Sequence, residues 1–129
     1  MSTDKLNLIA KKLCEKPKGI LAADESTNTI KKRFDSINVE SNFEMRKAYR
    51  ELLFKTPNLK NFISGVILFD ETIRQEDSEK TSLAKYLLDN DIIPGIKVDT
   101  GAIHLEKNSQ EKLTDCLLYT SDAADEWLR

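Results

Sequence analysis

Histidine and cysteine are scarce in this chain of 129 residues, and their scarcity excludes several kinds of chemistry. His104 is the only histidine, which excludes most histidine-based triads and zinc sites built within the chain. The two cysteines, Cys14 and Cys116, are far apart and form no CxxC motif. A disulfide framework is therefore not expected, and a reducing, cytoplasmic setting is the simpler interpretation.

Long apolar runs and an excess of one charge are also missing. No segment approaches the roughly 18 consecutive apolar residues of a membrane span, and the amphipathic first residues do not resemble a secretory signal. With 20 basic and 22 acidic side chains, the formal net charge is -2. Neither nucleic acid nor a membrane is therefore expected as a partner.

The sequence does contain alternating helical and strand patterns. Apolar residues at helical spacing predict an amphipathic helix over about 4–15, two helices between residues 27 and 57, and another over about 79–89. Three short apolar runs predict buried strands over 19–24, 63–70 and 92–99. This alternation is typical of an α/β fold with a parallel sheet.

The sequence also indicates which stretches are polar and which helix faces are buried. The charge-rich stretch 74–80 is interpreted as a solvated loop, and residues 101–115 are polar with no clean period. The two helices between the first and second strands are expected to bury the apolar faces Ile30, Phe34 and Ile37, and Met45, Tyr49, Leu52 and Leu53.

Each of the three apolar runs ends in an aspartate: Asp24, Asp70 and Asp99. The carboxyl ends of parallel strands line the binding crevice in α/β proteins, so these side chains indicate a polar site. The alternative is that each is an ordinary loop or helix-capping residue. A lysine beside the last one, Lys97, favours the site, because a lysine pointing inward needs a carboxylate or a phosphate. An inward Lys97 could pair with Asp24; the alternative is an outward lysine lying between helices.

The segment after the first strand, DESTNT followed by Lys31, Lys32 and Arg33, lies where a helix begins. Backbone N–H groups and the helix dipole favour a phosphate there, and Ser, Thr and Arg side chains can complete the site. Simple helix capping beside a solvated basic face explains the same residues equally well. The glycines of nucleotide-binding loops are missing, so this is not a nucleotide motif.

Several segments resemble class I fructose-bisphosphate aldolases: KGILAADEST (18–27), YRELLFKTP (49–57), SGVILFDET (64–72) and YLLDNDIIPGIKVDTGA (86–102). The resemblance covers about residues 5–115, which are expected to form the amino-terminal part of the barrel. Residues 116–129 are expected to be a non-family tail of artefactual or foreign origin. The resemblance implies an α/β fold containing the first three β/α units of a TIM (β/α)8 barrel, incomplete in this chain.

The same resemblance implies reversible cleavage of fructose 1,6-bisphosphate through a lysine Schiff base, without metal or cofactor, in a cytoplasmic and often homo-oligomeric enzyme. By position, Asp24 and Lys97 match active-site residues, and Ser26, Thr29 and Arg33 match positions near a substrate phosphate. The Schiff-base lysine belongs to a later strand, so this chain is expected to be inactive alone. The alternative is a non-catalytic fragment that binds sugar phosphates or associates with other subunits.

Overall fold

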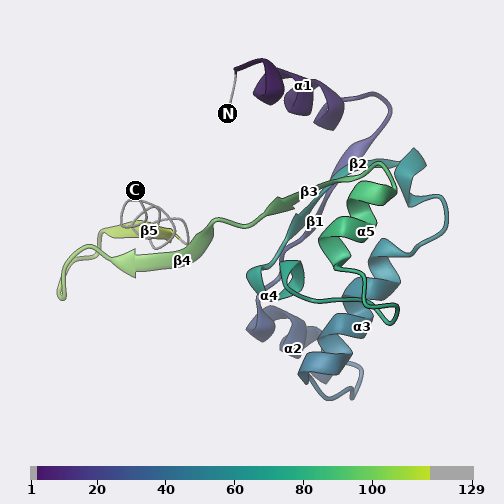
Figure 1. Ribbon diagram of the computed structural model, residues 1–129. Coiled ribbons are helices and arrows are strands. Elements are labelled where there is room, and N and C mark those ends of the chain that lie inside the picture. Colours follow the sequence, from purple (N-terminus) through teal and green to yellow (C-terminus); the bar gives the residue numbers. More distant parts are fainter. Residues whose placement is uncertain (1–2, 117–129) are drawn as a thin grey trace, which may run out of the picture. The chain divides into compact units, whose positions relative to one another are not determined.

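The computed structural model describes residues 3–116, which fall into two compact units with their boundary between Lys97 and Val98. The second unit contains a hairpin of β4 (Asp99–His104) and β5 (Lys112–Cys116). The first unit contains, in chain order, α1 (Thr3–Leu13), β1 (Gly19–Ala23), α2 (Thr27–Asp35), α3 (Phe43–Phe54), the 3-10 helix η1 (Leu59–Asn61), β2 (Ile63–Leu68), α4 (Asp70–Ile73), α5 (Leu83–Asp89) and β3 (Ile93–Ile96) (Figure 1).

The sheet of the first unit has the order β1-β2-β3, and both pairings are parallel. Leu21 lies opposite Val66, and Gly65 lies opposite Ile93. Parallel neighbours need a crossover connection, which α2 and α3 provide between β1 and β2 and α5 provides before β3. The predicted α/β fold with a parallel sheet is therefore confirmed.

Side-chain caps fix where the crossover helices begin. Ser26 Oγ accepts a hydrogen bond from the Thr29 N–H at 3.4 Å, and Asn42 Oδ1 accepts one from the Met45 N–H at 2.9 Å. Ser82 caps α5 in the same way. Each cap satisfies an N–H that the first turn of a helix leaves unpaired. The chain therefore turns from β1 into α2 within a few residues, which keeps the predicted site segment short.

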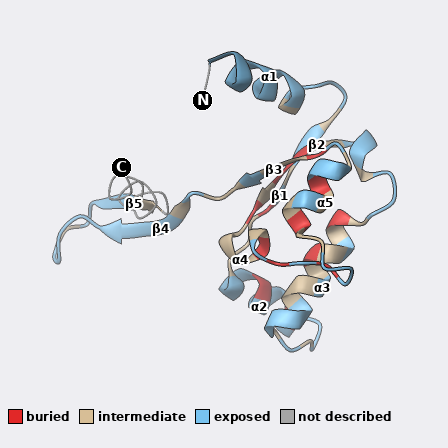
Figure 2. Cartoon of the chain, in the orientation of Figure 1, coloured by how far each residue is buried: buried red, intermediate tan, exposed pale blue. Residues whose placement is uncertain are grey.

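The core lies where α3 and α5 cover the sheet, and Figure 2 shows the buried residues gathered on these elements. Phe54 closes it at the end of α3, and Leu83 and Leu87 fill it from α5. The other buried members are Ala23, Val66, Leu68 and Ile92. Fully burying a side chain of this size stabilises the fold by about 1.5–3 kcal/mol.

The predicted buried faces of the helices are partly wrong. Met45 and Leu52 are exposed, Leu52 at 72%, whereas Arg50 and Phe54 are the buried residues of α3. The buried side of α3 carries arginines because carboxylates on the strand-end loops pair with them. Ile37 is also exposed, because α2 ends at Asp35 and the chain has left the helix before it.

The structure adds detail to two segments whose sequence predicted neither helix nor strand. The stretch 74–80 is a loop whose residues are mostly exposed, as predicted, but Gln75 and Asp77 are buried, so its interpretation as solvated is wrong for these two residues. The Asp77 carboxylate accepts hydrogen bonds from the N–H groups of Glu79 and Thr81, each at 2.9 Å, and so closes its own loop. Residues 99–116 form the antiparallel hairpin, whose largely exposed strands lack the apolar alternation that marks a half-buried strand.

The end of α1 is tied to the central strand. Ser64 Oγ lies 2.7 Å from the Leu13 carbonyl oxygen and 3.2 Å from that of Gly19. Gly65 makes room for the same contact, because a Cβ there would lie 2.4 Å from Leu13 Cδ2 and 3.2 Å from the Ile93 carbonyl oxygen. Within residues 3–116, no helix is long and apolar enough to cross a membrane.

We therefore expect Gly65→Ala to lower the free energy of unfolding by about 1–2 kcal/mol, because Leu13 and the Ile93 carbonyl must both move. Gly95→Ala is the matched control: its Cβ would meet the Val66 carbonyl oxygen at an ordinary 3.6 Å. Urea unfolding followed by circular dichroism measures both. Equal stabilities for the two variants would show that the close approach of Leu13 to Gly65 does not constrain the fold.

Candidate functional site

The first feature of the predicted site is an ion pair between residues that follow β1 and β3, the two strands on either side of β2. Asp24 follows β1 and Lys97 follows β3, and β2 lies between these two strands. Lys97 Nζ is 3.7 Å from Asp24 Oδ2, and both side chains are about three-quarters buried, with exposures of 30% and 26%. The Lys97 N–H donates to the Leu68 carbonyl oxygen at 2.9 Å, which holds its backbone along β2. The inward position predicted for Lys97 beside Asp24 is therefore present, while the catalytic roles of both residues stay predictions.

The other two strand-end aspartates behave differently. Asp70 is the first residue of α4 and pairs with Arg74 Nη2 at 3.0 Å, at an exposed surface. Asp99 is the first residue of β4, in the second unit. Asp70 therefore serves as an acidic residue in the first turn of α4, without a side-chain capping bond, and a role of Asp70 or Asp99 in the site stays a prediction.

Ser26 and Thr29 lie together at the start of α2. Their hydroxyl oxygens are 3.1 Å apart, and Ser26 also accepts the Thr29 N–H. These contacts match the capping interpretation. They also keep both hydroxyls at a helix amino terminus, where N–H groups and the dipole favour an anion. Phosphate binding by Ser26 and Thr29 stays a prediction.

Arg33 is drawn into a network that the sequence did not reveal. Its guanidinium donates to the Glu25 carboxylate and, at 3.2 Å, to the Tyr49 hydroxyl. Glu25 also accepts from Arg50, which in addition donates to the Glu25 carbonyl oxygen at 2.9 Å. Arg50 lies over the Tyr49 ring, 5.4 Å from its centre, and that ring makes an edge contact with Phe34. Two arginines therefore share one carboxylate directly after Asp24.

The electrostatics of Glu25 follow from this contact. Burial acts to raise the pKa of the Glu25 carboxyl, but hydrogen bonds from Arg50 and Arg33 and the charge of Arg50 hold the pKa below its ordinary value of 4.5. Glu25 is thus a carboxylate at neutral pH. One signal could have found it: Arg46, Arg50 and Phe54 recur every four residues on one face of the predicted helix.

A second arginine of α3 makes the equivalent contact at the next strand. Arg46 donates to the two carboxylate oxygens of Glu71 at 2.8 and 2.7 Å. Glu71 follows Asp70 as Glu25 follows Asp24, so two arginines one turn apart hold the residues beyond β1 and β2. Bidentate pairs of this kind fix geometry as well as charge.

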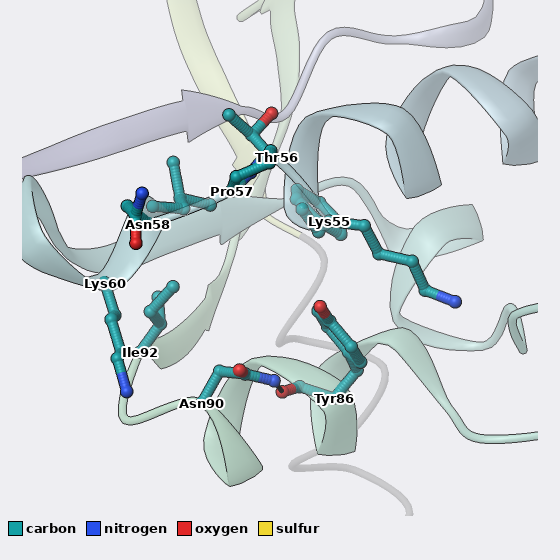
Figure 3. Close-up of a pocket in the computed structure, with 10 residues that line it drawn as sticks. Lys55, Thr56, Pro57, Asn58, Lys60, Tyr86, Asn90 and Ile92 are labelled. Atoms are coloured by element: carbon teal, nitrogen blue, oxygen red, sulfur yellow. Dashed lines mark hydrogen bonds between the residues drawn. The ribbon is translucent and has the colours of Figure 1, made fainter.

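The structure also contains a cavity of about 240 Å³ lined by residues 54–60 and by Tyr86, Asn90 and Ile92 (Figure 3). These residues precede β2 and β3, so the cavity lies at the amino ends of the strands, away from the Asp24–Lys97 pair. Lys55 pairs with Glu51 at 2.9 Å and Asp77 at 3.1 Å, and in Figure 3 its side chain points away from Asn58 and Lys60. The amino ends of barrel strands contribute to stability rather than catalysis.

Among residues 3–116, no three histidine, cysteine, aspartate or glutamate side chains are grouped so that they could hold a metal ion. The carboxyl edge carries a carboxylate, an ammonium group, two hydroxyls and a guanidinium. This set can bind a phosphorylated, hydroxyl-rich molecule.

The fold and the site define an α/β protein with a polar site at the carboxyl edge of a parallel sheet. The family described as fructose-bisphosphate aldolase class-I, a glycolytic family, matches residues 5–127. The chain belongs to the class I fructose-bisphosphate aldolase family. The match runs into the segment 116–129, which was expected to be a non-family tail; residues 117–129 lie outside the described residues, and the origin of this segment stays a prediction.

Individual relatives agree. The chain is 54% identical over 108 residues to fructose-bisphosphate aldolase 2 of Plasmodium berghei, covering 84% of this chain and 29% of the relative. It is 49% identical over 114 residues to the Plasmodium falciparum (isolate K1) aldolase, covering 88% and 32%. A solved structure of Plasmodium falciparum aldolase, in complex with TRAP and a small-molecule inhibitor, matches with a TM-score of 0.84 and 46% identity, covering 97% of this chain and 36% of that one.

The chain thus spans about a third of the length of the relatives it matches. Its three parallel strands, β1, β2 and β3, are the first three of an aldolase barrel and do not close among themselves. The predicted fold class is confirmed.

The Asp77 loop gives a test of the electrostatics. The Thr81 N–H and the Lys55 ammonium group hold the pKa of Asp77 below its ordinary value of 3.8. A carboxyl with a lowered folded-state pKa contributes stability above its unfolded pKa, and this is lost as the pH falls through the folded value. We expect Asp77→Asn to remove part of the acid-induced loss of stability below about pH 4.

Urea unfolding measured at a series of pH values checks this expectation. Lys55→Met should reduce the pH dependence less than Asp77→Asn does, because the N–H groups of Glu79 and Thr81 still bind the carboxylate. If Asp77→Asn lost as much unfolding free energy at acid pH as the unsubstituted chain does, the lowered pKa of Asp77 would be contradicted.

Proposed function

We propose that this chain forms one wall of the active site of a fructose-bisphosphate aldolase, which cleaves fructose 1,6-bisphosphate reversibly to dihydroxyacetone phosphate and glyceraldehyde 3-phosphate. The observation that carries the proposal is the Asp24–Lys97 pair at the carboxyl edge, 3.7 Å apart, within the family match. Active sites of (β/α)8 barrels are built at this edge.

Each site residue has a defined task in this proposal. The Asp24 carboxylate accepts a hydrogen bond from a substrate hydroxyl, and Lys97 holds that carboxylate while adding positive charge to the pocket. Ser26, Thr29 and the amino terminus of α2 bind a substrate phosphate, with Arg33 as its charged partner. The proposal includes a sugar phosphate as the substrate, no cofactor, and a cytoplasmic setting in which Cys14 and Cys116 stay unpaired.

The covalent step belongs to a different lysine. In the proposed reaction a lysine amine condenses with the substrate carbonyl and releases water. The resulting iminium then takes up the electron pair of the breaking carbon–carbon bond. By resemblance this lysine lies on a later strand than β3. The chain of 129 residues therefore contributes binding and polarising groups and is expected to show no turnover by itself.

A second candidate is a non-catalytic fragment that binds sugar phosphates or associates with other subunits. The edge strand β1 favours it: Ile20 is half exposed, and β1 pairs with a described strand on one side only. Unpaired strand edges bind other polypeptides readily.

A cleavage assay coupled to triose-phosphate detection separates the two candidates. We expect no turnover by the purified chain, and no covalent adduct when it is incubated with fructose 1,6-bisphosphate and borohydride. Mass spectrometry detects such an adduct directly. Turnover that borohydride abolishes would show that this chain holds its own Schiff-base lysine.

Binding of inorganic phosphate tests the site itself. We expect Lys97→Met to weaken binding about tenfold, because the pocket loses a positive charge and the Asp24 carboxylate loses its cationic partner. Lys60→Met is the matched control, since Lys60 lines the cavity at the opposite ends of the strands. Isothermal titration at constant pH and ionic strength measures both. Equal losses in the two variants would mean that phosphate is attracted by overall charge and not by this site.

A further inference from the structure

The Glu25 carboxylate is shared by two arginines that differ in exposure. The Arg50 side chain is only 3% exposed and holds Glu25 twice, through the carboxylate and through the carbonyl oxygen. The Arg33 side chain is 53% exposed and reaches only the carboxylate of Glu25. The buried arginine is therefore fixed in place, whereas the exposed one can reach a ligand in solvent.

We propose that Arg50 is a positioning residue for the phosphate site: it holds Glu25 permanently, so that Arg33 can exchange its contact with Glu25 for a contact with a substrate phosphate. The inference rests on the proposed function, because it takes Arg33 as the phosphate partner. It adds Arg50 and Glu25, which the sequence did not single out.

Glu25 needs a cationic partner at all times, whether or not a phosphate is bound. The Glu25 side chain is only 14% exposed, and a carboxylate at such a position is costly without a cationic partner. If Arg33 were its sole partner, a phosphate would have to compete with this carboxylate for the same guanidinium. Because Arg50 stays bound, Glu25 keeps a cationic partner when Arg33 moves to the phosphate. The free energy needed to move Arg33 from Glu25 to the phosphate is therefore smaller.

Tyr49 holds the Arg33 side chain near Glu25 through a second hydrogen bond. Its hydroxyl accepts a hydrogen bond from Arg33 at 3.2 Å. Its ring packs edge-on against the Phe34 ring, with 5.8 Å between the ring centres, and the Arg50 guanidinium carbon lies over the Tyr49 ring, 5.4 Å from its centre. Arg33 is therefore held beside the amino-terminal side of the site by a neutral group as well as by Glu25. The backbone contact from Arg50 fixes the residue that directly follows Asp24, which orients the end of β1.

Titration with inorganic phosphate at constant pH tests the proposal. We expect Arg50→Met to weaken binding about tenfold, because Glu25 then retains Arg33. Adding Glu25→Gln to Arg50→Met should restore the affinity to within about twofold of the unsubstituted chain, because the competing charge is gone. If Arg50 had a purely structural role, adding Glu25→Gln would not restore the phosphate affinity. A double variant that binds as weakly as Arg50→Met overturns the proposal.

Arg46→Met is the matched control. Arg46 lies one turn before Arg50 on α3 and holds Glu71 instead of Glu25, so its loss should leave phosphate affinity unchanged. A loss equal to that of Arg50→Met would mean that any weakening of α3 disturbs the site, and would overturn the specific role of Arg50. If Arg50→Met does not fold, the double variant is compared with the unsubstituted chain directly. It carries no uncompensated carboxylate, and the same twofold expectation applies.

A second measurement needs neither phosphate binding nor a change at Arg50. In Arg33→Met, the pKa of Glu25 followed by NMR should stay below its ordinary value, because Arg50 still donates to the carboxylate. Return of that pKa to its ordinary value would make Arg33 the main partner and overturn the proposal. If the unsubstituted chain binds no phosphate, the phosphate site of the proposed function fails, whereas the pKa of Glu25 in Arg33→Met still decides whether Arg50 is its permanent partner.

Discussion

Parallel pairing of three strands is the constraint on which the rest of this unit depends. Because β1, β2 and β3 run in one direction, each must be connected to the next by a crossover, and the helices of those crossovers cover the sheet. The same geometry brings the ends of β1 and β3 to one edge. Asp24 and Lys97, 73 positions apart in the chain (97 − 24), thereby lie 3.7 Å apart.

Helix α3 connects the core to that edge. Its last turn places Phe54 among the apolar residues between helices and sheet, and its earlier turns place Arg50 and Arg46 against Glu25 and Glu71. A buried charge is tolerable only when it is paired and hydrogen-bonded. The pairing therefore fixes both the rotation of the helix and the loops that follow β1 and β2.

The two ends of the strands differ in the charged groups that they carry. At the amino ends, Lys55 pairs with both Glu51 and Asp77 around a turn. At the carboxyl ends, partly buried groups of both signs meet beside a helix amino terminus. Membership of the aldolase family agrees with this difference, since barrel enzymes use the carboxyl ends.

The sequence by itself determined the order of helices and strands, the parallel sheet and the strand-end position of Asp24 and Lys97, because these follow from local periodicity and from the rules of crossover connections. It failed where a partner distant in the chain decides the outcome. Arg50 and Asp77 look like surface charges until Glu25 and Lys55 are placed beside them, and the exposed strands of the hairpin carry no apolar alternation. Only the tertiary structure showed which charges are buried, because burial of a charge depends on a counter-charge that local sequence patterns do not contain.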